Sequence, residues 1–425
     1  MHMSVTADVV VVGAGVIGSS IAFELAGTGR SVVVVDKASG PGQGSTSASS
    51  AVIRFNYSTW DGIALSWESK HCWEKWADHL EGVDDAGMAK FHRVGMVFLD
   101  VDIAPMDRVL EMFDRAGIPY EVWDANELAR RMPGLDPGRF WPPKRIEDPA
   151  FWEETDRRLG ALWTPDSGFV DDPGLAAVNL ANGAKRRGAR FLFRRQVVAV
   201  LGDGPVNGVR LDDGTTVSAP VVVNAAGPWS GRLNALAGVG AGWSVTVRPM
   251  RQEVHHVPAP AGYNGEGIGP CVADLDLGVY LRGAPGDGLL VGGTEPECDE
   301  LQWVDDPDAA NPNPTAQVFA AQVTRAARRL PELGVPGKPI GVAGVYDVTE
   351  DWTPIYDGTE RAGFYVAIGT SGNQFKNAPM VGRLMRAVID GESGVVGEHT
   401  RLEIGLAAFG RARPRNADST GTVMG

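Results

Sequence analysis

The first forty residues alternate between runs of apolar residues and glycine-rich turns. A β-branched run at residues 8–12 leads into GAGVIG at residues 13–18, and apolar residues then recur at helical spacing up to Leu25. A second strand of the buried type follows at residues 31–35. Because strand, helix and strand come in this order, the pattern predicts a β-α-β unit with parallel strands and a right-handed crossover.

The rest of the chain mixes two kinds of pattern. Helices are predicted over residues 60–80, 175–187, 317–330 and 378–389. Strands are predicted at residues 191–201, 221–223, 342–346 and 363–368, and a hairpin at 208–217. Strands with Gly/Pro turns at 245–293 predict a mixed or antiparallel sheet. Proline-containing breaks near residues 133 and 142 mark a less regular second lobe. The final stretch, about fifteen residues, is polar and is predicted to be loose.

The glycines at residues 13–18 have the spacing of a dinucleotide-binding turn. Gly13 and Gly15 permit a tight turn and the close approach of a pyrophosphate, and Gly18 lets the helix pack closely on the strand. Asp36 follows at the end of the second strand, 23 residues after Gly13, where a carboxylate can bond ribose hydroxyls. We therefore expect a bound dinucleotide, although the motif alone does not choose NAD over FAD.

A second segment of small residues, GPGQGSTSASS, occupies residues 40–50. It is either a flexible loop or a second phosphate-binding segment whose hydroxyl and N–H groups face the cofactor. In the second case Ser45 and Thr46 lie beside the cofactor, and we expect Lys37, next to Asp36, there as well.

Composition and charge narrow the classes of partner. The 425 residues carry 39 Lys and Arg against 53 Asp and Glu, a net charge of −14, so neither nucleic acid nor a membrane is expected as a partner. An anionic ligand therefore needs a local positive pocket. The three cysteines lie far apart, which suggests neither a disulfide framework nor a metal site. The N-terminal apolar run is too short and glycine-rich to span a membrane, so we expect a cytoplasmic soluble protein.

Three segments together carry a resemblance: the N-terminal β-α-β unit, the strand that ends in Asn224-Ala225-Ala226-Gly227, and residues 369–379. With them the chain resembles the D-amino-acid oxidase superfamily of flavoproteins, in particular the sarcosine oxidase and glycine oxidase branch, which includes the flavin subunits of heterotetrameric sarcosine oxidase. This implies an α/β fold with a discontinuous Rossmann-like FAD-binding domain and a substrate domain with a mixed or antiparallel sheet. We place the FAD-binding domain at residues 1–90, 163–235 and 340–405, the substrate domain at 91–162 and 236–339, and a C-terminal tail at 406–425.

The resemblance also assigns contacts to FAD in an extended pose. Gly13, Gly15, Gly18 and Asp36 would contact the ADP half, Gly227 would lie near the pyrophosphate, and the backbone of Val197 or Val198 would meet the adenine. The segment Gly372-Asn373-Gln374-Phe375-Lys376 matches the family's Gly-His-Gly-Phe-Lys stretch, from which Asn373 and Gln374 depart. We expect non-covalent FAD, because monomeric sarcosine oxidases anchor flavin through a cysteine in a segment aligned with Ala343–Asp347, which contains none.

Two basic residues are the candidates for binding substrate. Arg54 and Lys376 match the arginine and lysine that the sarcosine oxidase branch uses on a substrate carboxylate. Arginine offers a planar fork to a carboxylate, and lysine adds a point charge. The alternative for Arg54 is an internal ion pair with Asp61 or Glu68.

The resemblance implies an FAD-dependent oxidation of a carboxylate-bearing amine, such as an N-alkyl or secondary amino acid, by hydride transfer to flavin N5 to give an imine. Tyr346, and with less support Tyr280, would line the active site. O2 or another acceptor would take the electrons, and Leu290 aligns with a lysine that promotes oxygen reduction in monomeric sarcosine oxidases, which favours slow oxygen reduction. Two alternatives stay open: the FAD subunit of a multi-subunit amine dehydrogenase or oxidase, and a non-catalytic FAD-binding assembly protein.

Overall fold

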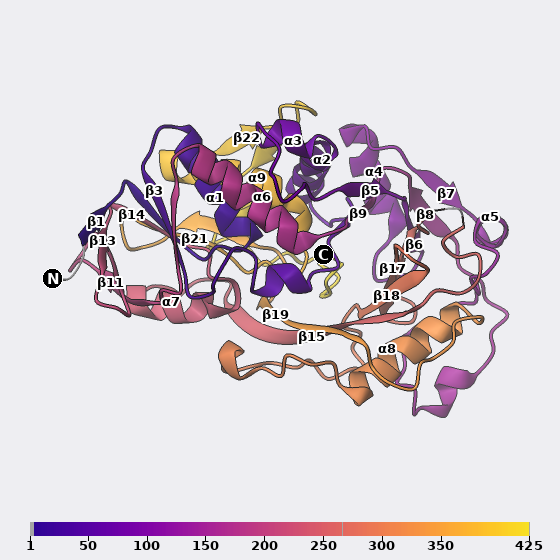
Figure 1. The fold of residues 1–425 in the computed structure, drawn as a ribbon. Coiled ribbons are helices and arrows are strands. Elements are labelled where there is room, and N and C mark those ends of the chain that lie inside the picture. The colour runs from indigo at the N-terminus through magenta and orange to yellow at the C-terminus, as the bar shows by residue number, and fades with distance from the viewer. Residues whose placement is uncertain (1–3, 266, 425) are drawn as a thin grey trace.

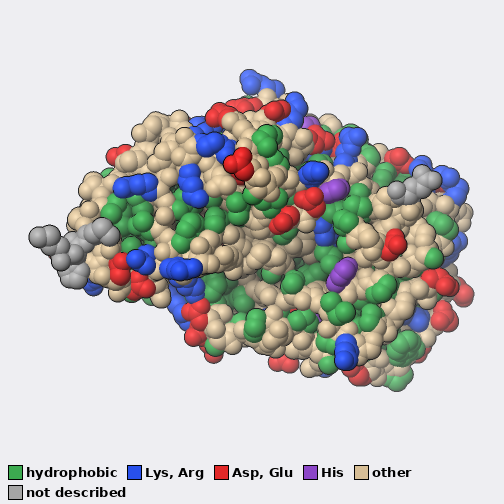
Figure 2. Space-filling model, viewed as in Figure 1, with side chains coloured by type: hydrophobic (Ala, Val, Ile, Leu, Met, Phe, Trp, Pro, Cys, Tyr) green, Lys and Arg blue, Asp and Glu red, His purple; other side chains and the backbone are tan. Residues whose placement is uncertain are grey.

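The computed structural model describes residues 4–265 and 267–424, which form two lobes side by side (Figure 1). One lobe contains a mostly parallel six-stranded sheet, and the other contains an eight-stranded mixed sheet. The predicted fold class, a Rossmann-like lobe joined to a second sheet domain, is confirmed. None of the described helices has the length and apolar character that crossing a membrane would require. Figure 2 shows basic and acidic side chains interspersed over one face of the molecule.

The six-stranded sheet is built from valine runs. In spatial order its strands are β10 (Arg190–Phe193), β3 (Val32–Asp36), β2 (Val9–Val12), β14 (Val221–Asn224), β21 (Phe364–Ile368) and β20 (Ile355–Gly358). Neighbouring strands are parallel except β20 and β21. Val9 and Val11 join the core on one face of the sheet, and Val10 and Val12 join a second core on the other. Burial on both faces explains why these strands are continuously apolar.

Helices cover one face of this sheet and a small sheet covers the other. On the first face α1 (Val16–Gly27) packs against both α6 (Pro173–Arg186) and α9 (Ala378–Asp390) (Figure 1). On the second lie α7 (Ser230–Ala237) and a four-stranded sheet of β1 (Ser4–Thr6), β13 (Thr216–Ser218), β12 (Gly208–Leu211) and β11 (Val197–Leu201). The carboxyl ends of β2, β3 and β14 and the amino end of α1 therefore meet at one edge, where α/β sheets bind ligands.

The second lobe carries the eight-stranded sheet. In spatial order its strands are β19 (Gly341–Thr349), β15 (Val247–Pro258), β18 (Gly288–Gly293), β17 (Val279–Ala284), β16 (Cys271–Asp274), β6 (Met96–Leu99), β8 (Ala161–Thr164) and β7 (Glu121–Trp123). Helix α8 (Ala316–Arg329) packs on β15, β17 and β18. Strand β19 pairs with β15 along its whole length. The residues from 341 to 349, which the sequence-based boundary gives to the FAD-binding domain, thus complete the sheet of the other lobe.

The remaining elements lie around these two sheets. They are helices α2 (Trp60–Glu74), α3 (Trp76–His79), α4 (Met106–Ala116) and α5 (Ala125–Arg131), the three-stranded sheet of β4 (Val52–Ile53), β9 (Gly168–Val170) and β5 (Phe91–Arg93), and the pair β22 (Gly394–Val396) and β23 (Glu403–Gly405). The helix predicted over residues 60–80 is divided at Lys75, whose backbone angles are not helical.

The final described residues are not loose, contrary to the expectation from their polar composition. Arg413 forms a buried ion pair with Asp351 at 2.8 Å. Thr422, Val423 and Met424 are only 5%, 8% and 5% exposed. The prediction was wrong because it rested on the average polarity of the whole stretch. A few small and apolar residues near its end insert between the lobes, and the average does not reveal them.

A buried charge network joins α8 to the second sheet. Arg329 donates from Nε to Asp274 and from Nη2 to Asp276, each at 2.7 Å, and all three side chains are fully buried. Arg329 also donates to the backbone carbonyls of Asp136 and Gly138. The network thereby fixes a loop that has little regular structure of its own.

Replacing Arg329 with methionine should lower the free energy of unfolding by about 3–5 kcal/mol, because two carboxylates lose their buried cation. Denaturant unfolding of the FAD-loaded protein measures this loss. The control is Arg130→Met, which removes a surface ion pair with Glu127 and should cost less than about 1 kcal/mol. Equal losses in the two variants would contradict a structural role for the buried network.

Candidate active site

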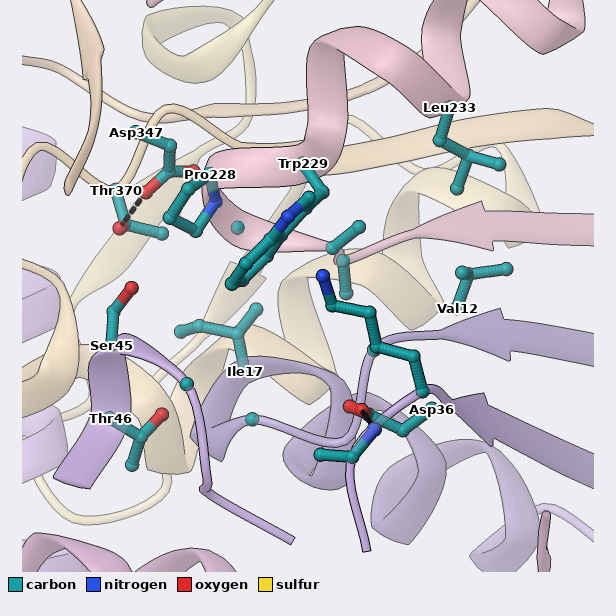
Figure 3. Close-up of a pocket in the computed structure, with 18 of the residues that line it drawn as sticks. Val12, Ile17, Asp36, Ser45, Thr46, Pro228, Trp229, Leu233, Asp347 and Thr370 are labelled. Carbon is teal, nitrogen blue, oxygen red and sulfur yellow. Dashed lines mark hydrogen bonds between the residues drawn. The ribbon is translucent and has the colours of Figure 1, made fainter. Parts of the chain in front are cut away.

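A cavity of about 270 Å³ lies at the edge where β2, β3 and β14 end (Figure 3). Asp36 and Lys37 belong to one part of its wall, and Tyr346 and Gln374 to another. Segments far apart in the chain meet here, as the sequence analysis expected. The predicted cofactor residues on its wall are Gly13, Gly15, Asp36, Lys37, Ser45, Thr46, Gly227, Gly372 and Gln374.

The glycine turn at the start of α1 leaves no room for side chains. Gly13 has φ +109°, and a Cβ atom there would lie 2.3 Å from the carbonyl oxygen of Ala225. Gly18 does not line the cavity but packs beneath the turn, where a Cβ atom would lie 1.9 Å from the Gly13 oxygen. Helix α1 has neither a side-chain cap at Gly15 nor an acidic residue in its first turn. The N-terminal N–H groups of this helix therefore suit an anion such as a pyrophosphate.

The polar side chains at the other strand ends are held by the backbone. Asp36 accepts hydrogen bonds from the N–H groups of Ala14 at 2.6 Å and Ala38 at 2.7 Å. Each carboxylate oxygen keeps a lone pair for a ribose hydroxyl. Thr46 Oγ1 accepts from the N–H of Val16 at 3.1 Å, which ties the second small-residue segment to the start of α1. The glycine cradle, the uncapped helix and this carboxylate fit the ADP half of FAD.

At one end of this cavity, Trp229 and Lys37 contact a loop of the second lobe. Trp229 lies beside the cavity in Figure 3, with Lys37 Nζ 3.8 Å from its ring centroid, and it donates to Asp308 at 3.0 Å. Asp308 also pairs with Lys37. Of the two adjacent valines considered for the adenine contact, Val197 lines the cavity, whereas Val198 is 41% exposed. The cavity therefore favours Val197 for this contact.

A second cavity, of about 50 Å³, adjoins the first. The two cavities share Ser49, Tyr346, Gly372 and Phe375 as wall residues. At this junction the chain needs glycine at residue 372, because a Cβ atom there would lie 2.3 Å from the Tyr346 ring and clash with it. The further walls of the smaller cavity include Arg54, Tyr280, Asn373 and Lys376. The structure thus brings the predicted substrate residues together at one end of the predicted cofactor cavity.

Arg54 and Lys376 are buried cations, 3% and 4% exposed. Arg54 Nη2 donates to the carbonyl of Val423 at 2.8 Å, and Lys376 Nζ donates to Tyr57 Oη at 3.1 Å. Among the described residues, no carboxylate forms an ion pair with either cation. The alternative of an ion pair with Asp61 or Glu68 is wrong, since those carboxylates accept backbone N–H groups of residue 405 and of residues 398–400.

Burial shifts the proton equilibria of both cations. It lowers the pKa of Arg54, and burial together with the charge of Arg54 brings the pKa of Lys376 well below its usual range. Tyr57, which the sequence analysis missed, lies beside both: its ring centroid is 5.0 Å from Arg54 Cζ and 5.2 Å from Lys376 Nζ. An anion bound here would relieve the repulsion between two desolvated cations.

Glu295 is a second residue that sequence reasoning missed. Its Oε2 accepts the N–H of Val423 at 2.9 Å, and its backbone has φ +54°, in the left-handed region. Burial raises the pKa of its carboxyl to about 8. Glu295 lies in the turn after β18, and no sequence motif includes it. Only its position after a strand of the eight-stranded sheet could have indicated a functional role.

Four other residues lie in varied positions relative to the two cavities. The adjacent histidines His255 and His256 of β15 line neither cavity: His255 is buried against the ring of Phe319 and His256 is exposed. Tyr280 lines the smaller cavity. Leu290 lines neither cavity, and its cross-strand neighbour on β17 is the buried cation Arg282.

Comparison with known proteins identifies the family and the fold. The family model described as FAD dependent oxidoreductase, DAO, matches residues 8–388. The chain is 26% identical over 391 residues to glycine oxidase of Geobacillus kaustophilus, which covers 90% of this chain and 93% of that protein. It is 26% identical over 397 residues to 4-methylaminobutanoate oxidase (formaldehyde-forming) of Paenarthrobacter nicotinovorans, covering 91% of this chain and 44% of that protein. The solved structure of L-proline dehydrogenase from P. horikoshii shares the fold, with a TM-score of 0.74 and 24% identity over 92% of this chain and 95% of that one.

FAD should be released by acid precipitation and appear in the supernatant. Of the three cysteines, only Cys271 lines either cavity; it lines the smaller one, and burial raises the pKa of its thiol to about 12, which disfavours the reactive thiolate. Absorbance of supernatant and pellet measures the distribution. The variant Gly13→Ala, which crowds the glycine turn, should purify with much less flavin than wild type. Yellow colour retained in the wild-type pellet would contradict non-covalent binding.

Proposed function

We propose that this chain, which belongs to the DAO family of FAD-dependent oxidoreductases, oxidises a carboxylate-bearing amine such as an N-alkyl or secondary amino acid. The chain is thus an FAD-dependent amine oxidoreductase, and the proposal concerns its substrate. The observation that carries it is the pair Arg54 and Lys376, two buried cations without a carboxylate partner among the described residues. Such a pair is costly unless an anion joins it.

The two cations would hold the substrate by its carboxylate. Arg54 presents a guanidinium fork, and Lys376 is fixed by Tyr57 and by the carbonyl of Asn373. With the carboxylate on these groups, the amine-bearing carbon is directed toward Tyr346 and Gly372, where the two cavities adjoin. Orientation by a fixed carboxylate is a large part of what a protein contributes to such a reaction.

The same surroundings favour the reactive form of the amine. A dry cavity disfavours an ammonium ion, and two nearby cations disfavour it further, so a bound amine loses its proton more readily than in water. Bound FAD supplies the two-electron acceptor, and the protein supplies orientation and electrostatics.

The first test is the choice of substrate and the effect of the two cations. Anaerobic bleaching of the flavin against a panel of amino acids and N-methyl amino acids identifies the best substrate. For that substrate, Arg54→Ala and Lys376→Ala should each reduce kcat/KM by the equivalent of about 2–4 kcal/mol, because each removes one partner of a buried charge interaction. FAD should stay bound in both variants, since neither residue lines the larger cavity.

The matched control is Arg93→Ala, which removes an exposed arginine that pairs with Asp166 at the surface and should leave kcat/KM unchanged. Amines without a carboxylate should be affected less than the best substrate by the two cation variants. Turnover of the carboxylate substrate at wild-type rates in both Arg54→Ala and Lys376→Ala would contradict the proposal.

The second test concerns the electron acceptor. Leu290, rather than lysine, lies on the same face of β18 as Gly292, which packs against Tyr280 of the smaller cavity. We expect reduced enzyme to react slowly with oxygen, so that electrons pass to another acceptor or to a partner subunit, and we expect Leu290→Lys to accelerate reoxidation. Stopped-flow mixing of reduced enzyme with oxygen measures both. Wild-type reoxidation as fast as reduction by substrate would instead identify an ordinary oxidase.

A further inference from the structure

The segment from residue 416 to residue 424 runs into the space beside the buried cations. Asn416 donates to Ser58 at 2.8 Å, and Asp418 pairs with Arg108 of α4. Val423 and Met424 then form part of the wall of the smaller cavity. A short stretch of the chain therefore fills space next to the groups assigned to substrate binding.

One residue of this segment makes both kinds of contact that an amino acid would make. The carbonyl oxygen of Val423 accepts from Arg54 Nη2 at 2.8 Å, and its N–H donates to Glu295 Oε2 at 2.9 Å. The amide nitrogen and the carbonyl carbon of a residue are separated by a single Cα atom. Arg54 and Glu295 are thus placed to receive an acceptor and an N–H donor that flank one carbon.

Glu295 has no other side-chain hydrogen bond among the described residues. The carboxyl group lies close to the cavity, because its partner Val423 is a wall residue. Burial, then interaction with Tyr280 and then interaction with Glu295 raise the pKa of Tyr346. The left-handed backbone of Glu295 is a conformation that residues other than glycine rarely adopt, and such conformations concentrate at functional sites. If Val423 withdrew, this partly buried carboxyl group would lose its N–H donor.

We propose that Glu295 is the partner of the substrate's amine nitrogen, and that the segment 419–424 holds the substrate site until substrate displaces it. The inference rests on the proposed function, because it takes Arg54 as the partner of the substrate carboxylate. The carbonyl of Val423 stands in for that carboxylate, and its N–H stands in for the amine. Substrate and segment therefore compete for the same two side chains.

The test uses the full-length, FAD-loaded protein and two matched ligands. The first, 2-aminoisobutyrate, has no hydrogen on its α-carbon, so it binds without being oxidised, and isobutyrate is the same molecule without the amine. Calorimetric titration gives the dissociation constant of each. Val423→Pro, which removes the N–H that Glu295 accepts, should tighten the binding of both ligands by about tenfold or more. Val423→Ala keeps the N–H and should therefore tighten binding much less than Val423→Pro.

The role of Glu295 is measured by the ratio of the dissociation constants of 2-aminoisobutyrate and isobutyrate. An effect of the substitution on docking of the segment 419–424 changes both constants alike and therefore cancels in the ratio. Glu295→Gln should shift this ratio by about tenfold against 2-aminoisobutyrate, whereas Glu297→Gln, an exposed neighbour on the same turn, should leave it unchanged. An unchanged ratio in Glu295→Gln would overturn the assignment of Glu295. Unchanged binding in Val423→Pro would overturn the competition by the segment.

Two further measurements keep the outcomes distinct. If Val423→Pro does not fold, Met424→Lys replaces it, because a third cation in the wall that holds Arg54 and Lys376 disfavours docking of the segment and should tighten binding in the same way. Isobutyrate binding that survives Arg54→Ala would contradict the carboxylate site, and with it the proposed function. Isobutyrate binding that is lost in Arg54→Ala, with an unchanged ratio in Glu295→Gln, would contradict only the present inference.

Discussion

Arg54 and Lys376 lie at the end of the cofactor cavity, both withdrawn from water and with no acidic side chain paired to them among the described residues. A buried cation needs partners, and here those partners are Tyr57, backbone carbonyls and the Val423 peptide. These are neutral groups, so the site keeps a net positive character in a protein whose overall charge is −14. The pocket is therefore complementary to an anionic group, such as the carboxylate proposed above, and its selectivity is local rather than a property of the whole surface.

The positions of these cations depend on two turns in which the backbone is so closely packed that only glycine fits. The turn at Gly13 fits against Ala225, and the turn at Gly372 fits against the ring of Tyr346. The first brings the amino end of α1 to the cavity, and the second sets Lys376 four residues beyond the junction of the two cavities. The parallel valine ladder fixes both turns at the same edge of one sheet. The larger and the smaller cavity are thus adjacent because of strand order, not because of a single motif.

Local patterns in the sequence were sufficient to predict the β-α-β unit of the first lobe. The valine runs, the glycine spacing and Asp36 identify the β-α-β unit and its ligand, and resemblance adds Arg54, Tyr346 and Lys376 to one site. Contacts between distant, unpatterned segments could not be predicted in this way. Glu295 follows a strand without any spacing signal, and Val423 ends a polar stretch, yet a hydrogen bond joins them. The pairing of β19 with β15 was missed for the same reason, since strand partners depend on the tertiary fold.

The requirement of the two cations for a carboxylate can be tested most directly by thermal unfolding of the FAD-loaded protein with isobutyrate and with isobutyramide. The two ligands have nearly the same shape and differ in charge, and a ligand that binds the folded state raises Tm according to its affinity. Isobutyrate should raise Tm progressively with concentration, and isobutyramide should not. An equal rise with both ligands would show that the pocket responds to shape alone and would contradict the assignment of Arg54 and Lys376 to a substrate carboxylate.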